Sequence, residues 1–330
     1  MKPRGMFVLP EENFRLIYSP EHVSRIQELV DLRLPCQSSD EVRKNLSLLD
    51  GVELIFTGWG SLEFTTDVLN AAPDLKMIFY GAGSIRGVMT EAAWERGVRI
   101  TSAWAANAVP VVEFTLANIL LCLKKAYQHA AEYRAKRQWV RLPVAGAYHS
   151  TVGLISLGMI GRLLAEKLKS FEVHVIAYDP YVSQEEANHL NVEMVSLEEV
   201  FRRGDVVSLH TPLLETTRGM IRGEHLSWMK EGAAFINTSR GAVVREDEMI
   251  AVLRQRPDLF AVLDVTWPEP AAPDSPLFTL PNVFLTPHIA GSMGAECQRM
   301  GQLMVEELER YLEGRPLAYE ITRERAALLA

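Results

Sequence analysis

The segment Thr151-Val-Gly-Leu-Ile-Ser-Leu-Gly-Met-Ile-Gly161 decides the fold. It combines a short apolar strand, a turn of small residues and a helix start, which is the context that the dinucleotide-binding fingerprint G-x-G-x-x-G requires. Ser156 takes the first glycine position and is followed by Gly158 and Gly161. The second glycine lets a pyrophosphate approach the backbone, and the third lets helix and strand pack closely. Serine tolerates a positive φ less well than glycine, so we expect a slightly altered turn.

The residues that follow the fingerprint predict the identity of the cofactor. Backbone amides at Met159 and Ile160 would face the pyrophosphate, with the positive end of the helix dipole behind them. Asp179 ends the next apolar run, 21 positions after Gly158 (179 − 158 = 21), where an acidic side chain accepts hydrogen bonds from ribose hydroxyls. Residues 180–182 include no Arg or Lys that could meet a 2′-phosphate. The sequence therefore favours NAD over NADP.

The rest of the chain alternates continuous apolar runs with helical patterns. Such runs are typical of strands buried on both faces of a parallel sheet. We expect strands at Val52–Thr57, Lys76–Tyr80, Thr151–Ile155, His174–Tyr178, Val206–Leu209, Ala234–Asn237, Phe260–Val265 and Val283–Thr286. We expect helices at Val111–His129, Met159–Phe171, Arg245–Gln255 and Ala295–Glu313. The alternation predicts an α/β fold with two doubly wound domains.

Length and composition limit the architecture and the partners. A chain of 330 residues is long enough for about two domains, and its 48% hydrophobic content supplies their cores. We place one domain at 105–292, around the fingerprint, and the other at 1–104 together with 293–330. The net charge of −8 argues against binding to nucleic acid or to an anionic membrane. We also expect no apolar run long enough to span a membrane.

Cysteine usage predicts the compartment. The three cysteines are far apart and form no C-x-x-C pair, so the sequence suggests neither a disulfide framework nor a zinc site. A reducing cytoplasm fits this pattern. The apolar stretch Met6–Leu9 ends at Pro10 and is too short for a signal peptide. The histidines show no metal-ligand spacing, and we expect no metal.

Three polar side chains, Arg240, Glu269 and His288, each follow a predicted strand. Ligands of open α/β sheets bind beyond the carboxyl ends of the strands, so these side chains can converge although they are distant in sequence. A histidine can donate a proton near neutral pH, and a carboxylate can orient its imidazole. A guanidinium can hold a carboxylate with two hydrogen bonds. Together these residue types suit the reduction of a 2-oxoacid by a hydride from a nicotinamide, although each one alone is more often structural.

These motifs resemble the D-isomer-specific 2-hydroxyacid dehydrogenase family, whose members include formate- and glycerate-dehydrogenase-like proteins. The resemblance is strongest between Asn107 and Gly291. It implies that Arg240 binds the substrate carboxylate, Glu269 orients His288, and His288 is the acid/base. It also implies a Rossmann NAD-binding domain inserted into a flavodoxin-like substrate domain. The family further implies a homodimer built largely on the cofactor domain.

The resemblance extends to the residues that contact cofactor and substrate. The implied cofactor set is Gly158, Met159, Ile160, Gly161, Asp179, His210, Thr211, Pro212, Thr217, Thr238, Asp264 and Gly291. The segment Tyr80–Gly87 resembles the family's glycine loop, whose amides at Ala82 and Gly83 would hold the substrate carboxylate. The loop then departs from the family pattern at Ser84–Arg86, so substrate preference is not carried over by analogy.

Two features bear on the substrate, and two other functions remain open. The segment Phe56–Ser61 has no cation, which argues against a phosphorylated substrate. Trp59, Trp104 and Trp267 follow predicted strands and could form an aromatic wall for a bulky or apolar 2-oxoacid, or at least two of them could merely pack at the domain or dimer interface. One alternative function is a non-catalytic NAD(H)-binding module, as in corepressors of this fold. The other is a methyltransferase using S-adenosylmethionine, in which the Arg–Glu–His set has no role.

Overall fold

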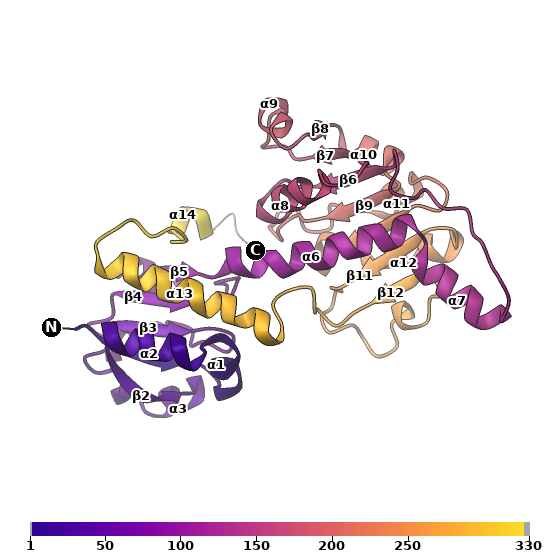
Figure 1. The fold of residues 1–330 in the computed structure, drawn as a ribbon. Helices are drawn as coiled ribbons and strands as arrows, with labels where there is room; N and C mark the ends of the chain where they lie inside the picture. The colour runs from indigo at the N-terminus through magenta and orange to yellow at the C-terminus, as the bar shows by residue number, and fades with distance from the viewer. Residues whose placement is uncertain (1, 327–330) are drawn as a thin grey trace. The chain divides into compact units, whose positions relative to one another are not determined.

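The computed structural model describes residues 2–326 and divides the chain into two compact units (Figure 1). The terminal unit consists of Met1–Ala108 and Ser292–Ala330, and the central unit consists of Val109–Gly291. The sequence had placed the borders after residues 104 and 292. The first border lies inside helix α6 (Trp104–Leu123), so one continuous helix leads from the terminal unit into the central unit.

The terminal unit is a parallel five-stranded sheet with helices on both faces. Its strands are β1 (Arg4–Val8), β2 (Asp31–Gln37), β3 (Leu54–Thr57), β4 (Met77–Tyr80) and β5 (Arg99–Ser102). Its helices are α1 (Glu11–Ile17), α2 (Pro20–Leu29), α3 (Ser39–Lys44), α4 (Thr66–Ala71), α5 (Glu91–Glu95), α13 (Cys297–Leu312) and α14 (Arg323–Ala326). The strand order β2-β1-β3-β4-β5 is that of flavodoxin-like sheets.

The two ends of the chain share one core in this unit. Ile17 and Ile26, from α1 and α2, pack with Met304 of α13 on one face of the sheet. Helices α4 and α5 cover the other face. Arg25 of α2 forms an ion pair with Glu309 of α13 at 2.7 Å, and the two helices lie side by side (Figure 1). The C-terminal segment therefore belongs to the first domain, and the central unit is an insertion.

The central unit is a parallel seven-stranded sheet. Its strands are β6 (Thr151–Ile155), β7 (His174–Tyr178), β8 (Glu193–Met194), β9 (Val206–Leu209), β10 (Ala234–Asn237), β11 (Phe260–Leu263) and β12 (Val283–Leu285). Its helices are α6, α7 (Ala126–Lys136), α8 (Met159–Leu168), α9 (Gln184–Asn188), α10 (Leu197–Arg203), α11 (Gly223–Ser227) and α12 (Glu246–Gln255). Val112 of α6 and Leu164 of α8 pack on one face, and Leu226 of α11 and Met249 of α12 pack on the other.

The order β12-β11-β10-β9-β6-β7-β8 is that of a Rossmann sheet with one further strand. Strand β6 pairs with β7 on one side and with β9 on the other, so the direction of winding reverses beside β6. Such a switch point opens a crevice at the carboxyl ends of the strands. The predicted fold class, a Rossmann domain inserted into a flavodoxin-like domain, is confirmed.

Helix α6 differs from the prediction in two ways. The single helix expected at Val111–His129 is two helices, because the chain turns at Lys125 (φ 48°) between α6 and α7. The expectation that no segment could span a membrane was also wrong by length and composition, since the 20 residues of α6 are apolar enough to do so. In the structure, 56% of that stretch is buried, and Ile119 packs in the core of the central unit. The buried core helix of a globular protein can have the same length and apolar composition.

Candidate active site

Three adjacent strands, β10, β11 and β12, deliver the candidate catalytic side chains. Arg240 follows β10, Glu269 follows β11 and His288 follows β12. Because all three strands are parallel, their carboxyl ends lie along one edge of the sheet. The fingerprint turn after β6, Asp179 after β7 and His210 after β9 follow strand ends at the same edge.

Glu269 and His288 form a hydrogen-bonded pair. The distance from Nδ1 of His288 to Oε1 of Glu269 is 2.6 Å. A carboxylate accepts, so Nδ1 carries the proton, and Nε2 is left to exchange a proton with another molecule. The side chains of His288 and Glu269 are 48% and 36% exposed, which leaves the pair accessible. The geometry is that of an acid/base histidine oriented by a carboxylate.

Asp264 holds the loop that carries His288. Its buried carboxylate accepts hydrogen bonds from Oγ1 of Thr286 (2.6 Å) and from the amides of Ile289 (2.8 Å) and Ala290 (2.9 Å). Its backbone carbonyl accepts from the amide of His288 at 2.9 Å. His288 has a φ of 56°, a strained value that surrounding contacts must maintain. Asp264 supplies those contacts, a role that the sequence did not predict.

The Arg240 loop touches the Glu269 loop through a glycine. A Cβ at Gly241 would overlap the backbone of Thr266, so only glycine allows this approach. Nδ2 of Asn237 donates to the carbonyl of Arg240 (3.2 Å), and Nη1 of Arg240 donates to the carbonyl of Ser239 (2.7 Å). The backbone that carries Arg240 is therefore packed against the one that carries Glu269.

The fingerprint turn leaves open space at Gly158 and places Gly161 against the backbone of Ser156. Ser156 has a φ of 78°, so the positive φ expected to disfavour serine is adopted nonetheless. Its hydroxyl lies 2.8 Å from that of Thr211, which fixes the side chain. A Cβ at Gly161 would overlap the carbonyl oxygen of Ser156, whereas one at Gly158 would meet no atom within 4 Å. Gly161 thus serves helix–strand packing, and Gly158 leaves open space at the start of α8.

Met159 and Ile160 form the first turn of α8, as expected, and Met159 is exposed. Asp179 accepts from the amide of Leu157 through Oδ2 and from that of Tyr181 through Oδ1, each at 2.8 Å. The carboxylate is therefore tied to the fingerprint turn. Open space beside a ten-residue helix N-terminus and an adjacent carboxylate fit a pyrophosphate and a ribose.

The loop after β9 places a buried histidine in this region. Nε2 of His210 lies 3.0 Å from Oγ of Ser208, while its Nδ1 is buried with no partner within residues 2–326. Burial lowers the pKa of His210 to about 4, so its imidazole is neutral at pH 7. Oγ1 of Thr217 donates to the carbonyl of Pro212 at 2.6 Å and closes the loop. An unpaired buried nitrogen fits a site that a ligand completes.

The remaining predicted residues are Thr238 and Gly291 in the central unit and Ala82 and Gly83 in the terminal unit. Thr238 is buried, with its hydroxyl 3.0 Å from that of Thr115, and Gly291 is the last residue of the central unit. In the terminal unit, Oγ of Ser102 donates to the carbonyls of Ala82 (2.8 Å) and Gly83 (2.6 Å). The amide of Ala82 donates to the carbonyl of Tyr80 at 2.8 Å, so one of the two predicted anion donors already has a partner.

Residues 116–290 match the sequence model described as "D-isomer specific 2-hydroxyacid dehydrogenase, NAD binding domain". The match covers more than half of the chain and nearly all of the central unit. The chain belongs to this family. The central unit is accordingly the family's NAD-binding domain, and NAD, the cofactor expected from the sequence, is confirmed.

Family members align over most of this chain. It is 33% identical over 253 residues to D-3-phosphoglycerate dehydrogenase of Methanocaldococcus jannaschii, covering 76% of this chain and 48% of that protein. It is 32% identical to glyoxylate reductase of Korarchaeum cryptofilum, covering 75% and 76%. The crystal structure of the TT0316 protein from Thermus thermophilus has a TM-score of 0.77 and 29% identity, covering 96% and 100%. The chain spans about half the length of the D-3-phosphoglycerate dehydrogenases that it matches.

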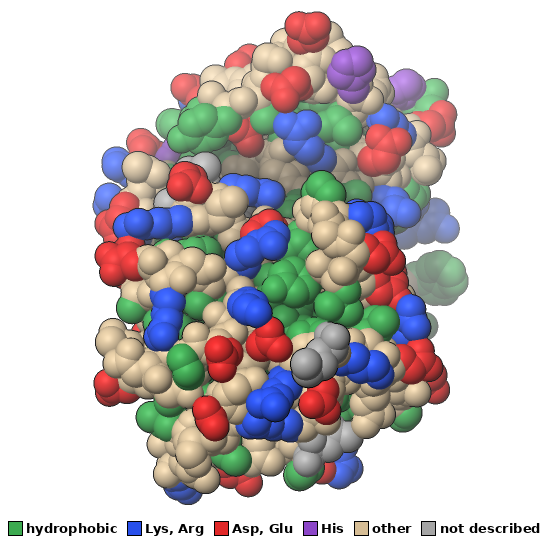
Figure 2. All heavy atoms as spheres, turned by 90° about the vertical axis from the view of Figure 1, so that its left-hand side faces the viewer, with side chains coloured by type: hydrophobic (Ala, Val, Ile, Leu, Met, Phe, Trp, Pro, Cys, Tyr) green, Lys and Arg blue, Asp and Glu red, His purple; other side chains and the backbone are tan. Residues whose placement is uncertain are grey.

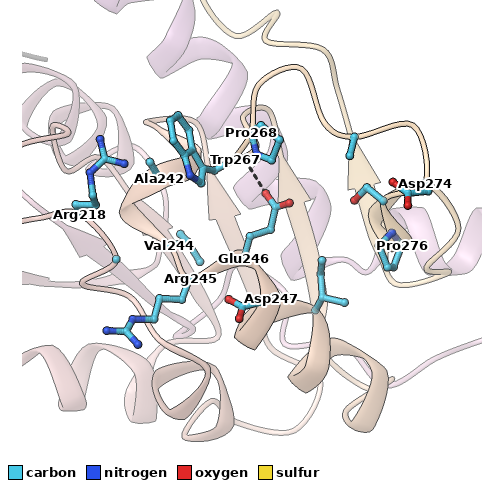
Figure 3. A pocket seen from close by; sticks show the side chains of 14 residues that line it. Arg218, Ala242, Val244, Arg245, Glu246, Asp247, Trp267, Pro268, Asp274 and Pro276 are labelled. Carbon is cyan, nitrogen blue, oxygen red and sulfur yellow. Dashed lines mark hydrogen bonds between the residues drawn. The ribbon is translucent and has the colours of Figure 1, made fainter.

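Within this family fold, a cleft lies beside the loops that follow β10 and β11, and the sequence does not predict it. It has a volume of about 710 Å³ and is bordered by the start of α12 and by the segments that contain Trp267 and Pro276 (Figure 3). The guanidinium of Arg218 lies over the ring of Trp267, 5.2 Å from its centroid. The carboxylate of Glu246 points toward the backbone amide of Trp267, as the dashed line in Figure 3 shows. Sequence spacing gave no signal for Glu246, because its partner is a backbone amide.

Of the three tryptophans singled out in the sequence, Trp59 and Trp104 pack within the terminal unit. Trp59 and Trp104 are half-buried against the cores of the terminal unit, and the ring of Trp104 meets that of Tyr319 edge-on. Trp267 is exposed. The contacts described for Trp59 and Trp104 are therefore with the cores of the terminal unit.

Two further features are the surface charge on one face and the spacing of possible metal ligands. On the face shown in Figure 2, Lys and Arg side chains are interspersed with Asp and Glu, without a broad area of one sign among the residues described. Within residues 2–326, no group of three or more His, Cys, Asp or Glu side chains is placed to bind a metal ion.

Proposed function

We propose that this protein is an NAD-dependent dehydrogenase that interconverts a D-2-hydroxyacid and a 2-oxoacid. The observation that carries the proposal is the 2.6 Å bond from His288 to Glu269 at the carboxyl edge of the NAD-binding domain. The D-isomer preference rests on the family alone. Membership of the family supports oxidoreduction of this substrate class, and the relatives' names include a phosphoglycerate dehydrogenase and a glyoxylate reductase.

The side chains divide the chemistry among them. Bound NADH supplies the hydride for the carbonyl carbon of the 2-oxoacid. The guanidinium of Arg240 binds the substrate carboxylate with two hydrogen bonds and polarises the adjacent carbonyl. Nε2 of His288 donates its proton to the carbonyl oxygen, and Glu269 stabilises the protonated imidazole before transfer. In the oxidative direction, His288 accepts the hydroxyl proton. Asp264 keeps the His288 loop in place throughout.

The substrate is proposed to be unphosphorylated. The segment Phe56–Ser61 supplies no cation for a phosphate. Positive charge for the substrate carboxylate comes from Arg240.

We further propose a homodimer formed through the central unit, in a reducing cytoplasm. Three large aromatic side chains on α7 and the segment after it, Tyr133, Trp139 and Tyr148, are exposed, and Trp139 is 87% exposed. Large exposed aromatic side chains of this kind mark interaction surfaces. A second copy of the chain would bury them.

The test is NADH consumption with a panel of small, bulky and acidic 2-oxoacids, followed by the loss of nicotinamide absorbance. Turnover of at least one 2-oxoacid is expected. Binding of NADH without turnover across the panel would favour the alternative of a non-catalytic NAD(H)-binding module. Absence of NADH binding would refute the proposal.

A further inference from the structure

Glu246 makes a contact that reaches the catalytic loop. It is the first residue of α12, and its Oε2 accepts a hydrogen bond from the backbone amide of Trp267 at 2.8 Å (Figure 3). Trp267 stands two positions before Glu269 in the sequence. This bond ties the segment after β11 to the start of α12 two residues before Glu269, and Arg218 lies over the ring of the same Trp267.

The bond acts together with the glycine contact described above. The backbone of Thr266 packs directly against Gly241, the first residue of the 3₁₀ turn Gly241–Val243. This contact sets the distance between that turn and the segment after β11. Van der Waals contact alone leaves the segment free to slide, whereas a hydrogen bond to the next amide fixes its direction. The exposed residues 267–270 are then held by the Glu246 bond together with the hydrogen bond from Oγ1 of Thr266 to the carbonyl of Pro268 at 2.8 Å.

The environment of Glu246 disfavours the charged form of its carboxylate. Burial raises its pKa, and the neighbouring carboxylate of Asp247 acts in the same direction. Arg218, Arg245 and Asp274 line the same cleft. A partly buried carboxylate is retained where an amide donor and a helix N-terminus stabilise it, and both are present here.

We propose that Glu246 is a positioning residue, which holds the backbone at Trp267 so that Glu269 meets Nδ1 of His288. The consequence for catalysis rests on the proposed dehydrogenase function, while the positional claim does not. Without the bond, the carboxylate of Glu269 moves, and the imidazole loses its fixed tautomer and orientation. Misplacement of a catalytic group by about 1 Å can cost on the order of 100-fold in rate.

The chain provides a matched control on the same helix. Oε2 of Glu248 accepts from the backbone amide of Gly223 at 2.9 Å, so it also ties α12 to another segment. Gly223 begins α11, which carries none of the candidate site residues. The variants are therefore Glu246→Ala, Glu246→Gln, which retains an acceptor oxygen for the amide, and Glu248→Ala.

The kinetic expectation separates positioning from general stability. Glu246→Ala should lower kcat about tenfold or more, with KM for the 2-oxoacid changed less than about twofold because Arg240 is retained. Glu246→Gln should recover most of kcat, and Glu248→Ala should stay within about twofold of the wild type. A kcat of Glu246→Ala within about twofold of the wild type, or equal losses in Glu246→Ala and Glu248→Ala, would overturn the proposal.

A second readout does not depend on turnover. In ¹⁵N-histidine-labelled protein at alkaline pH, long-range proton–nitrogen correlation spectra report which ring nitrogen carries the proton. His288, assigned by its loss in His288→Gln, should be in the Nδ1–H form in the wild type, Glu246→Gln and Glu248→Ala, and mixed in Glu246→Ala. An unchanged tautomer in Glu246→Ala would refute the positional claim. If the wild type shows this tautomer but reduces no 2-oxoacid, the proposed function fails and the positioning role stands.

Discussion

Buried His210 predicts a specific loss of stability in acid. The imidazole has a pKa lowered from 6.5 to about 4 by burial, and its side chain is almost inaccessible. Above pH 6.5 it is neutral in both the folded and unfolded states, and the folded state gains or loses nothing. As the pH falls from 6.5 toward 4, His210 binds a proton in the unfolded state but stays neutral in the folded state. Stability is therefore lost over this window.

The size of the effect follows from the shift. The full difference of 2.5 pH units (6.5 − 4) corresponds to about 3 kcal/mol, of which about 2 kcal/mol is lost by pH 5. The perturbation is His210→Gln, which does not titrate and whose amide can replace Nε2 opposite Ser208. Urea unfolding of the cofactor-free protein, followed by circular dichroism, gives the free energy of unfolding at pH 7.5 and pH 5.

The comparison between wild type and variant isolates this group, because other titrating groups contribute to both proteins. The free energy of unfolding of His210→Gln minus that of the wild type is measured at both pH values. This difference should be about 2 kcal/mol larger at pH 5 than at pH 7.5. A shift below about 0.5 kcal/mol would show that the imidazole titrates normally and would refute the reasoning from burial.

Three further predictions concern the cofactor site and the assembly. Gly161→Ala forces a Cβ against the carbonyl oxygen of Ser156, so NADH affinity measured by fluorescence should fall at least about tenfold; unchanged affinity would contradict the packing argument. Asp179→Ala removes the carboxylate beside the ribose, so the ratio of kcat/KM for NADPH to that for NADH should rise about tenfold or more, and an unaltered ratio would count against its role. Trp139→Ser should weaken the proposed dimer in sedimentation velocity runs, whereas a wild-type monomer would refute the proposed dimer.

Much of the central unit was predictable because its sequence signals are local. The bounds of β6, β7, β9 and β10 match the predicted runs, since strands buried on both faces are continuously apolar. The placement of Arg240 and His288 at one edge of the sheet was predictable because the carboxyl ends of parallel strands lie along the same edge. Ser156 departs from the fingerprint and adopts a positive φ of 78°.

The features that were missed depend on tertiary context. Strand β2 contains Asp31, Arg33 and Pro35, which a central strand would not tolerate, but it lies at the edge of its sheet. Strand β8 has only two residues. The break between α6 and α7 interrupts a helical pattern that continues on both sides. Glu246 escaped because its bond to the Trp267 amide joins a side chain to backbone, and a backbone amide has no sequence signature.

The central claim is that His288 exchanges a proton with the substrate while NAD binding is independent of it. The most direct measurement compares wild type and His288→Gln in the same assay, with kcat for a reduced 2-oxoacid and the Kd for NADH determined on one preparation. The account predicts a loss in kcat of about 1000-fold or more, with the Kd for NADH within about twofold of the wild type. A variant that keeps a tenth of the wild-type kcat would contradict it.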